Sequence, residues 1–258
     1  MKTIPNLRLP QLTLGVLALF TCLQASSATF TLNPAIDALV TTGSAGNLSG
    51  NNYGGAGALS VAAPNLAQGE FQSVLQFGLA GAKSSFDAQF GAGQWTIQSV
   101  TLQLTAIPPN NGIFNAAAAG QFAISFMQND GWTEGSGTPA APTTIGITFS
   151  TLSNFVGVAD ENLGTFGYNG VTSGNSTYSL GLTPAFTTDL LAGSAVSLRM
   201  FAVDTAVSYL SDSRSFGTGS ARPLLTITAV PEPASVALLL LGLGGAAARW
   251  SNFRARRG

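Results

Sequence analysis

The chain contains no histidine, and its single cysteine, Cys22, lies near the N-terminus. Without these residues no Ser-His-Asp or Cys-His nucleophile system can be assembled, and zinc, copper or haem sites built on imidazole or thiolate lack ligands. A lone cysteine also excludes an internal disulfide bond. We therefore expect stability from hydrophobic burial and β-sheet hydrogen bonds, and any metal site to be an oxygen-ligated one.

Charge is also scarce: charged residues make up 8% of the 258 residues, and the formal net charge is −1. Between Thr29 and Val230 there are ten acidic residues and four basic ones, a net formal charge of −6. The four basic residues are scattered: Lys83, Arg199, Arg214 and Arg222. Because no basic cluster is present between Thr29 and Val230 to replace phosphate counterions, we expect no nucleic-acid partner.

The C-terminal end combines a Pro-Glu-Pro triplet, an apolar run and a basic tail. Ala234 to Ala248 contains one polar residue, Ser235, and no charge. As a helix it would span about 22 Å, so an inner-membrane position requires Trp250 and the tail to reach the far interface of a bilayer about 30 Å thick. A buried core helix is the alternative, which the four terminal arginines disfavour: Arg249, Arg254, Arg256 and Arg257.

This order of features resembles the PEP-CTERM sorting signal of Gram-negative bacteria. The resemblance implies that a membrane-embedded exosortase recognises the box formed by Pro231, Glu232 and Pro233. It further implies that helix 234–248 anchors the precursor transiently in the inner membrane, with the arginines in the cytoplasm. We assign residues 231–258 to this sorting signal and expect a cell-surface or extracellular destination.

The N-terminal end is typical of a secretory signal helix. Lys2 and Arg8 precede the apolar run Leu12 to Leu23, and small residues follow at positions 26–28. This pattern predicts a signal peptide over residues 1–28, cut by signal peptidase between Ala28 and Thr29. Lipidation of Cys22 is the alternative, but Thr21 is larger than the residue expected before a lipidated cysteine.

Residues 29–230 form a single predicted domain of mainly β structure. Period-two alternation is clearest in Ser99 to Ala106, where apolar and polar side chains point to opposite faces. Five further runs show the pattern: Phe71 to Leu79, Phe122 to Phe126, Ile145 to Phe149, Val196 to Ala202 and Leu224 to Val230.

We predict eight to ten strands and one short helix. Thr183 can cap this helix, Pro184 suits its first turn, Leu190 and Leu191 supply an apolar side, and Gly193 can end it. Helices do not alternate with strands, so a single antiparallel β-sandwich, jelly-roll-like, is predicted.

The order of short motifs along this domain resembles the DNRLRE-type secreted β-sandwich, although the six-letter signature is missing. The motifs are Asp37, Asn52-Tyr53-Gly54, Leu75 to Leu79, Ile97 to Leu104, Gly131 to Glu134 and Arg222 to Leu224. Members of this family are similar to carbohydrate-binding jelly rolls. The resemblance therefore implies a secreted module of this kind.

One candidate sugar site is the segment in which Asp130 and Glu134 flank Trp132. An indole can stack on a pyranose ring while carboxylates bind hydroxyl groups. A packing role for Trp132 and turn roles for the two acids are favoured over ligand binding. The same two carboxylates, expected to be exposed with ordinary pKa values, are the best available pair for a glycoside-cleaving enzyme.

Asp160 and Glu161 form an oxygen-rich loop that is a candidate Ca²⁺ site, although no EF-hand spacing is present. No other cofactor is expected. The sequence favours a non-enzymatic surface or matrix protein associated with exopolysaccharide. A carbohydrate-binding module and a carboxylate-dependent glycosidase are the alternatives.

Overall fold

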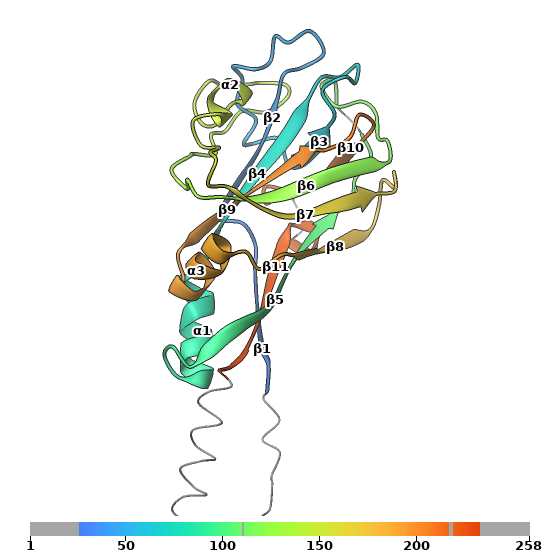
Figure 1. The fold of residues 1–258 in the computed structure, drawn as a ribbon. Helices are drawn as coiled ribbons and strands as arrows, with labels where there is room; N and C mark the ends of the chain where they lie inside the picture. Colours follow the sequence, from blue (N-terminus) through green and yellow to red (C-terminus); the bar gives the residue numbers. More distant parts are fainter. Residues whose placement is uncertain (1–25, 110, 217–218, 233–258) are drawn as a thin grey trace, which may run out of the picture.

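The structure is a computed structural model that describes residues 26–109, 111–216 and 219–232. Within them, eleven strands form two antiparallel sheets (Figure 1). The four-stranded sheet has the order β1-β11-β5-β8. Its strands are β1 (Ala28–Leu32), β5 (Trp95–Thr105), β8 (Asn175–Leu180) and β11 (Leu224–Pro231).

The seven-stranded sheet has the order β10-β3-β4-β9-β6-β7, and β2 also pairs with β4. Its strands are β2 (Ile36–Thr41), β3 (Ala58–Ala62), β4 (Phe71–Gly78), β6 (Gly120–Met127), β7 (Glu161–Tyr168), β9 (Ala195–Ala202) and β10 (Ser208–Asp212). The predicted mainly β, two-sheet antiparallel architecture is confirmed, with one strand more than the predicted maximum.

Strands of the four-stranded sheet alternate as their sequences predict. In β11, Leu225, Ile227 and Ala229 are buried, while the residues between them are partly exposed. The strand register aligns hydroxyl side chains in a row across all four strands: Thr31, Thr226, Thr101 and Ser179. One face of this sheet therefore packs on the core and the other carries hydroxyl groups.

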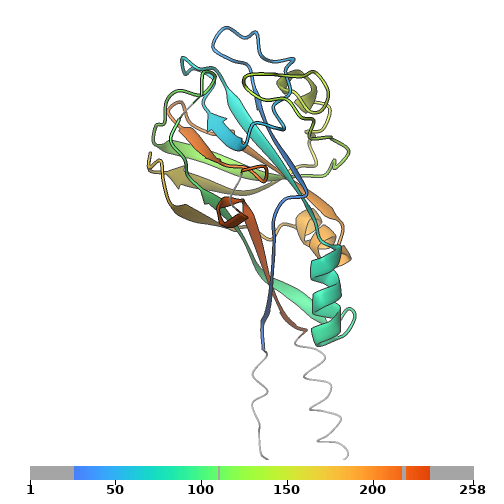
Figure 2. The ribbon, with the colours of Figure 1, turned by 180° about the vertical axis from the view of Figure 1, so that it is seen from behind.

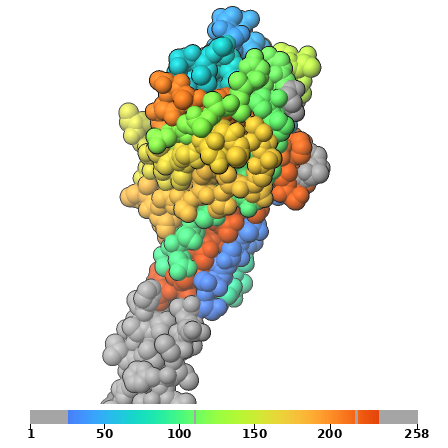
Figure 3. Space-filling model, turned by 90° about the vertical axis from the view of Figure 1, so that its right-hand side faces the viewer, coloured from blue at the N-terminus to red at the C-terminus, as the bar shows by residue number. Residues whose placement is uncertain are grey.

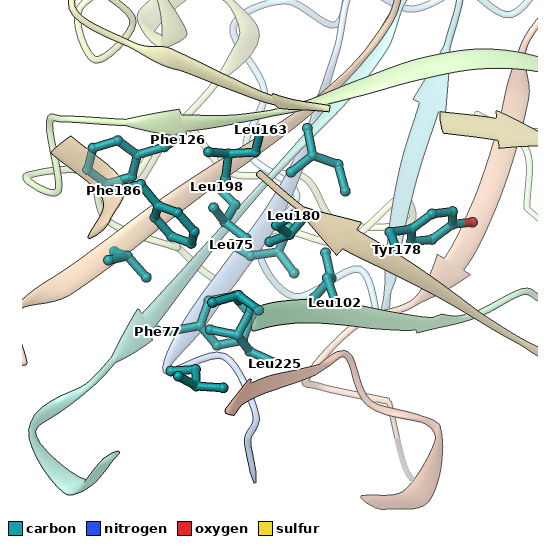
Figure 4. Close-up of a cluster of buried hydrophobic side chains, with 14 of the residues drawn as sticks. Leu75, Phe77, Leu102, Phe126, Leu163, Tyr178, Leu180, Phe186, Leu198 and Leu225 are labelled. Atoms are coloured by element: carbon teal, nitrogen blue, oxygen red, sulfur yellow. The ribbon is translucent and has the colours of Figure 1, made fainter. Parts of the chain in front are cut away.

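The main core lies between the two sheets (Figure 4), where Leu75 and Phe77 of β4 face Leu102 and Leu225 of the other sheet. Phe122 of β6 is central to it and is fully buried. Its ring centroid lies 5.2 Å from that of Tyr178 and 5.7 Å from that of Tyr209. Aromatic packing thus joins β6 to strands of both sheets.

Three α-helices are present in the described residues, so the prediction of one helix was wrong. The predicted helix is α3 (Pro184–Ala192), with Pro184 in its first turn and Gly193 left-handed at φ 71°. The longer α1 (Ala80–Phe90) escaped prediction because only Ala82 and Phe86 are buried, which leaves almost no 3.6-residue pattern. The third helix is the short α2 (Phe149–Leu152).

The strand predicted from Ile145 to Phe149 is absent, and this expectation was wrong. Ile145 is 77% exposed, Gly146 has φ 103°, and Phe149 begins α2. The backbone here makes hydrogen bonds outside a sheet ladder: the Ile147 N–H donates to the Thr133 carbonyl at 2.8 Å, and the Ile147 carbonyl accepts from Asn52 Nδ2 at 2.7 Å. The alternating pattern of three apolar residues gave no sign that the backbone of this segment makes its hydrogen bonds outside a sheet.

Figures 1 and 2 show β1, β11 and the first half of β5 extending below the seven-stranded sheet, with α1 beside them. We call these four segments the base. Phe30 and Trp95 both pack on Phe86 of α1, with ring centroids 6.5 Å and 5.1 Å away. In the space-filling view the base is narrower than the part above it (Figure 3).

Candidate functional site

The two predicted processing points lie next to each other at the lower end of the base. β1 pairs with β11 so that Ala28 lies opposite Ala229 and Thr29 opposite Thr228. Strand β1 begins where β11 is about to end (Figures 1 and 2). The predicted signal peptidase bond between Ala28 and Thr29 therefore falls at the first residue pair of β1.

The sorting box begins inside the four-stranded sheet. Pro231 is the last residue of β11 and lies opposite Trp95 of β5, and the Glu232 N–H donates to the Gln94 carbonyl at 2.9 Å. Trp95 is buried, and its Nε1 donates to Asp87 Oδ1 of α1 at 2.8 Å. The chain is thus held by hydrogen bonds up to Glu232.

The rest of the sorting signal lies outside the described residues. This applies to Pro233, to helix 234–248 and to Arg249, Arg254, Arg256 and Arg257. Residues 1–25, which include Cys22, are outside as well. In the part of the chain that the structure describes, no helix combines the length and hydropathy needed to cross a bilayer.

Trp132 does not present its ring to solvent, so the sugar platform considered for it is not formed. Its side chain is 3% exposed, and its Nε1 donates to Ser197 Oγ at 2.9 Å. It packs with Val74 and Leu152 in a small cluster on the outer face of the seven-stranded sheet. The favoured interpretation of Trp132 as a packing residue is thereby confirmed.

Glu134 and Asp130 lie in different environments, and neither is fully exposed as expected. Glu134 accepts from Arg214 Nε at 2.7 Å and from a terminal nitrogen of the same guanidinium. The Arg214 backbone N–H in turn donates to buried Asp37 at 2.7 Å. Burial raises the pKa of Asp37 to about 7, against the opposing effect of that hydrogen bond.

Asp130 is half-buried, and its Oδ1 has no hydrogen-bond partner. Burial raises the pKa of this carboxyl group, so the expectation of an ordinary pKa was wrong. Asp130 lines a hollow of about 450 Å³ together with Gln128, Asn129, Asn154, Phe155, Val156, Gly157, Ala159 and Asp160. We call it the amide hollow, because amide and carboxylate groups surround it.

Asp160 and Glu161 point to different places. The Asp160 carboxylate accepts the backbone N–H groups of Gln128 (3.2 Å) and Gly157 (3.1 Å) at the amide hollow. Glu161 instead binds the start of α3, accepting from Ala185 N at 3.1 Å and from Phe186 N at 3.0 Å. The two carboxylates therefore do not converge on one point.

Glu161 replaces Thr183 as the cap of α3. Thr183 makes no capping bond itself, and its hydroxyl donates to Glu161 at 2.5 Å. Burial raises the Glu161 pKa, but the bonds from Thr183 and the helix N–H groups outweigh it, so the pKa lies below its ordinary value. In the described residues, no group of three or more acidic, histidine or cysteine side chains is arranged to hold a metal ion.

The structure thus unites two separately predicted acids, Asp130 and Asp160, and separates Trp132, Glu134 and Glu161 from them. The other polar residues of the amide hollow come from two loops, 128–130 and 154–160. Gln128, Asn129 and Asn154 were not predicted from the sequence. Amide-rich loops are common on protein surfaces, and no sequence spacing marks the two loops as neighbours.

Comparison with known families identifies the C-terminal end. Residues 229–257 match the family model of the PEP-CTERM protein-sorting motif. The chain therefore carries this motif, and its first four residues, 229–232, belong to β11 and the bond that follows it. The resemblance of the preceding domain to DNRLRE-type modules is not shown by the comparisons.

No curated protein matches the chain. Among solved structures, a chain from Desmodium yellow mottle tymovirus matches with 9% sequence identity and a TM-score of 0.22. The match covers 90% of this chain and 97% of that one. A TM-score this low supports no conclusion on fold or function.

Proposed function

We propose that this protein is a non-enzymatic component of the cell surface or extracellular matrix that associates with exopolysaccharide. The observation that carries the proposal is the PEP-CTERM motif at residues 229–257, which marks an exported protein sorted by an exosortase. In this proposal residues 234–248 hold the precursor in the inner membrane until it is processed at the box.

The pairing of β1 with β11 supports this sequence of events. Both predicted cuts lie at the lower end of the base, so the domain above it is intact after both. The loops of the amide hollow belong to the part of the molecule above the base (Figures 1 and 2). A domain tethered through the base would therefore present the hollow away from its membrane anchor.

Exopolysaccharide binding is supported by the chemistry of the amide hollow. Amides and carboxylates bind hydroxyl groups in both donor and acceptor roles, and Phe155 supplies an apolar wall. A carbohydrate-binding module that uses this hollow, instead of Trp132, is the closest alternative. A glycosidase receives no such support, because Glu134 is paired with Arg214 and does not line the hollow with Asp130.

The C-terminus of the mature protein tests the sorting step. We expect mass spectrometry of the extracellular fraction to find a chain ending at or after Glu232, because earlier cuts remove residues that pair β11 with β5. A chain ending at Gly258 in both the membrane and extracellular fractions would contradict processing. Unchanged localisation after deletion of residues 231–258 would contradict sorting by the motif.

Retention on the native exopolysaccharide tests the binding step. Asn154→Ala removes an exposed amide from the hollow without touching the core, and we expect retention to fall severalfold. Asn47→Ala is the matched control, since Asn47 is an exposed amide outside the hollow. Equal retention of both variants and the wild type would contradict a role for the hollow.

A further inference from the structure

Arg199 is a cation without a carboxylate partner. Of the basic residues that the structure describes, Lys83 and Arg214 form ion pairs and Arg199 does not. Arg199 Nε donates to Gln72 Oε1 at 2.7 Å, and its Cζ lies 4.3 Å from the Phe201 ring centroid. Neither terminal nitrogen of the guanidinium has a hydrogen-bond partner in the described part of the chain. This end of the side chain is thus available to a ligand.

The amide of Gln72 keeps Arg199 from pairing with Glu70. Gln72 Nε2 donates to Glu70 Oε1 at 2.5 Å while its oxygen accepts from Arg199. Burial lowers the pKa of Arg199, and the negative charges of Glu70 and Asp160 oppose this effect without cancelling it. An arginine stays protonated under such conditions, so a partly desolvated positive charge remains unneutralised.

This charge faces a small cavity of about 230 Å³. The cavity lies between α2 and the outer face of the seven-stranded sheet, and we call it the arginine cavity. Its lining residues are Gln72, Phe149, Leu152, Ser153, Val156 and Arg199. Ligand pockets for drug-sized molecules span about 300–1,000 Å³, so this cavity suits one small group. Arg199 gives this lining a cationic group, and Phe149, Leu152 and Val156 give it apolar ones.

We propose that the arginine cavity binds the carboxylate-bearing residue of an acidic exopolysaccharide, that is, a uronate-type sugar. The planar guanidinium forms paired hydrogen bonds with a carboxylate, and these are stronger than bonds between neutral groups. The C–H face of the sugar ring packs on Phe149 and Leu152. This inference rests on the proposed association with exopolysaccharide and adds the chemical class of the sugar.

Continuity between the two cavities supports a polymer as the ligand. Val156 lines both the arginine cavity and the amide hollow. A chain seated with one acidic residue at Arg199 therefore has a hydroxyl-binding surface next to it. A free anion would use only the first of these two sites.

The test measures binding of alginate oligosaccharides, which are polyuronates, to the protein in its exported form. We expect Arg199→Gln to weaken this binding about tenfold or more, which corresponds to losing a charge-assisted hydrogen bond of about 1.4 kcal/mol. Arg199→Lys keeps the charge but loses the planar fork, so its binding should lie between the two. Thermal unfolding of each variant reports whether the fold is preserved.

Two further variants test whether alginate binding depends on the arginine cavity, and not on the net charge of the protein or on a loss of folding. Lys83→Gln removes the same charge from α1, far from the cavity lining, and should leave alginate binding unchanged. Ser153→Phe fills the cavity from an exposed position without altering Arg199, and should weaken binding as Arg199→Gln does. Equal losses in Lys83→Gln and Arg199→Gln would overturn the proposal.

The choice of probe separates the remaining outcomes. If wild-type protein binds neutral dextran but not alginate, the acidic-sugar proposal fails and the association with polysaccharide stands. If it binds neither these probes nor its native exopolysaccharide, both proposals fail. If acetate competes as strongly as free glucuronate, only a carboxylate is recognised and the assignment to a sugar is overturned.

Discussion

The two sheets share one core but differ in the residues on their outer faces. The strands of the four-stranded sheet contain no acidic or basic residue, and their outward side chains are mainly threonine, serine and glutamine. The seven-stranded sheet has a second apolar cluster on its outer face, beneath loop 128–160. In β3 and β10 every residue is buried.

This difference in the outer faces corresponds to a different role for each sheet. The four-stranded sheet contains the first and the last strand of the described residues, β1 and β11, and an uncharged hydroxyl face is sufficient for that role. The seven-stranded sheet supports the loops that form the amide hollow and the arginine cavity. It also holds three charged residues, Asp37, Arg199 and Asp212, in partly or fully buried positions.

The largest expected effect comes from placing one charge on each outer face. Val74→Asp puts a carboxylate into the apolar cluster under Trp132 and should cost more than about 4 kcal/mol of unfolding free energy. Thr226→Asp, on the hydroxyl face, should cost about 1 kcal/mol or less. Urea unfolding of both variants measures this, and similar costs would remove the distinction between the faces.

The junction between the sheets should give the next largest effect. Phe122→Ala leaves a cavity among Phe166, Tyr178 and Tyr209 and should cost about 3–5 kcal/mol. Phe216→Ala is the control, because Phe216 is 36% exposed and should change stability far less. If denaturant unfolding showed equal losses, Phe122 would not be a joint between the sheets.

Two ion pairs should differ by a smaller amount in their contribution to the free energy of unfolding: the pair of Arg214 with Glu134, and the pair of Lys83 with Asp87 in the base. Arg214→Met leaves the Glu134 carboxylate, 12% exposed, without its partner and should cost about 2 kcal/mol. Lys83→Met breaks an exposed pair with Asp87 on α1, where water screens the charges, and should change stability far less. Thermal unfolding at low and high salt checks both, and a larger loss for Lys83→Met would reverse the comparison.

The pH dependence of stability should come from the seven-stranded sheet. Asp37 has a pKa of about 7 and Asp212 one of about 6, in both cases because burial disfavours the charged form. The folded protein therefore binds more protons than the unfolded chain between about pH 4 and these values. Stability should fall as pH rises through this window, by up to about 1.4 kcal/mol per pH unit for each group.

Asp37→Asn tests this assignment. An asparagine oxygen can still accept the Arg214 N–H, but the side chain no longer titrates. We expect the variant to lose the slope between pH 6 and 7 and, below pH 6, to keep only the part due to Asp212. Denaturant unfolding at half-unit pH steps measures the slope, and an unchanged curve would show that Asp37 does not titrate in that range.

The difference between strands buried on one face and strands buried on both faces also explains which parts of the fold the sequence could predict. The alternation in Leu224 to Val230 and Ser99 to Ala106 predicted β11 and β5, because one face of each strand meets water. Strand β10 is buried on both faces and gave no such signal. Helix α1 was missed for a related reason, since it buries only two of its eleven residues.

The candidate sites were less predictable than the fold. The sorting motif is local and was identified from adjacent residues, whereas the arginine cavity joins Gln72, Arg199 and α2 from three distant segments. Trp132 was correctly interpreted as a packing residue from its residue type alone. Its neighbours Asp130 and Glu134 diverge because of Arg214, whose position depends on the tertiary fold.

The pairing of β1 with β11 also sets an order in time. Thr29 and Thr228, whose hydroxyls lie 3.4 Å apart, are separated by 199 positions in the chain. Contacts this distant in sequence form slowly, because nearly the whole chain must be ordered first. In a chain that emerges N-terminus first, β1 has no partner strand until the segment just before the sorting box has crossed. The four-stranded sheet therefore cannot be completed until almost the whole domain has been exported.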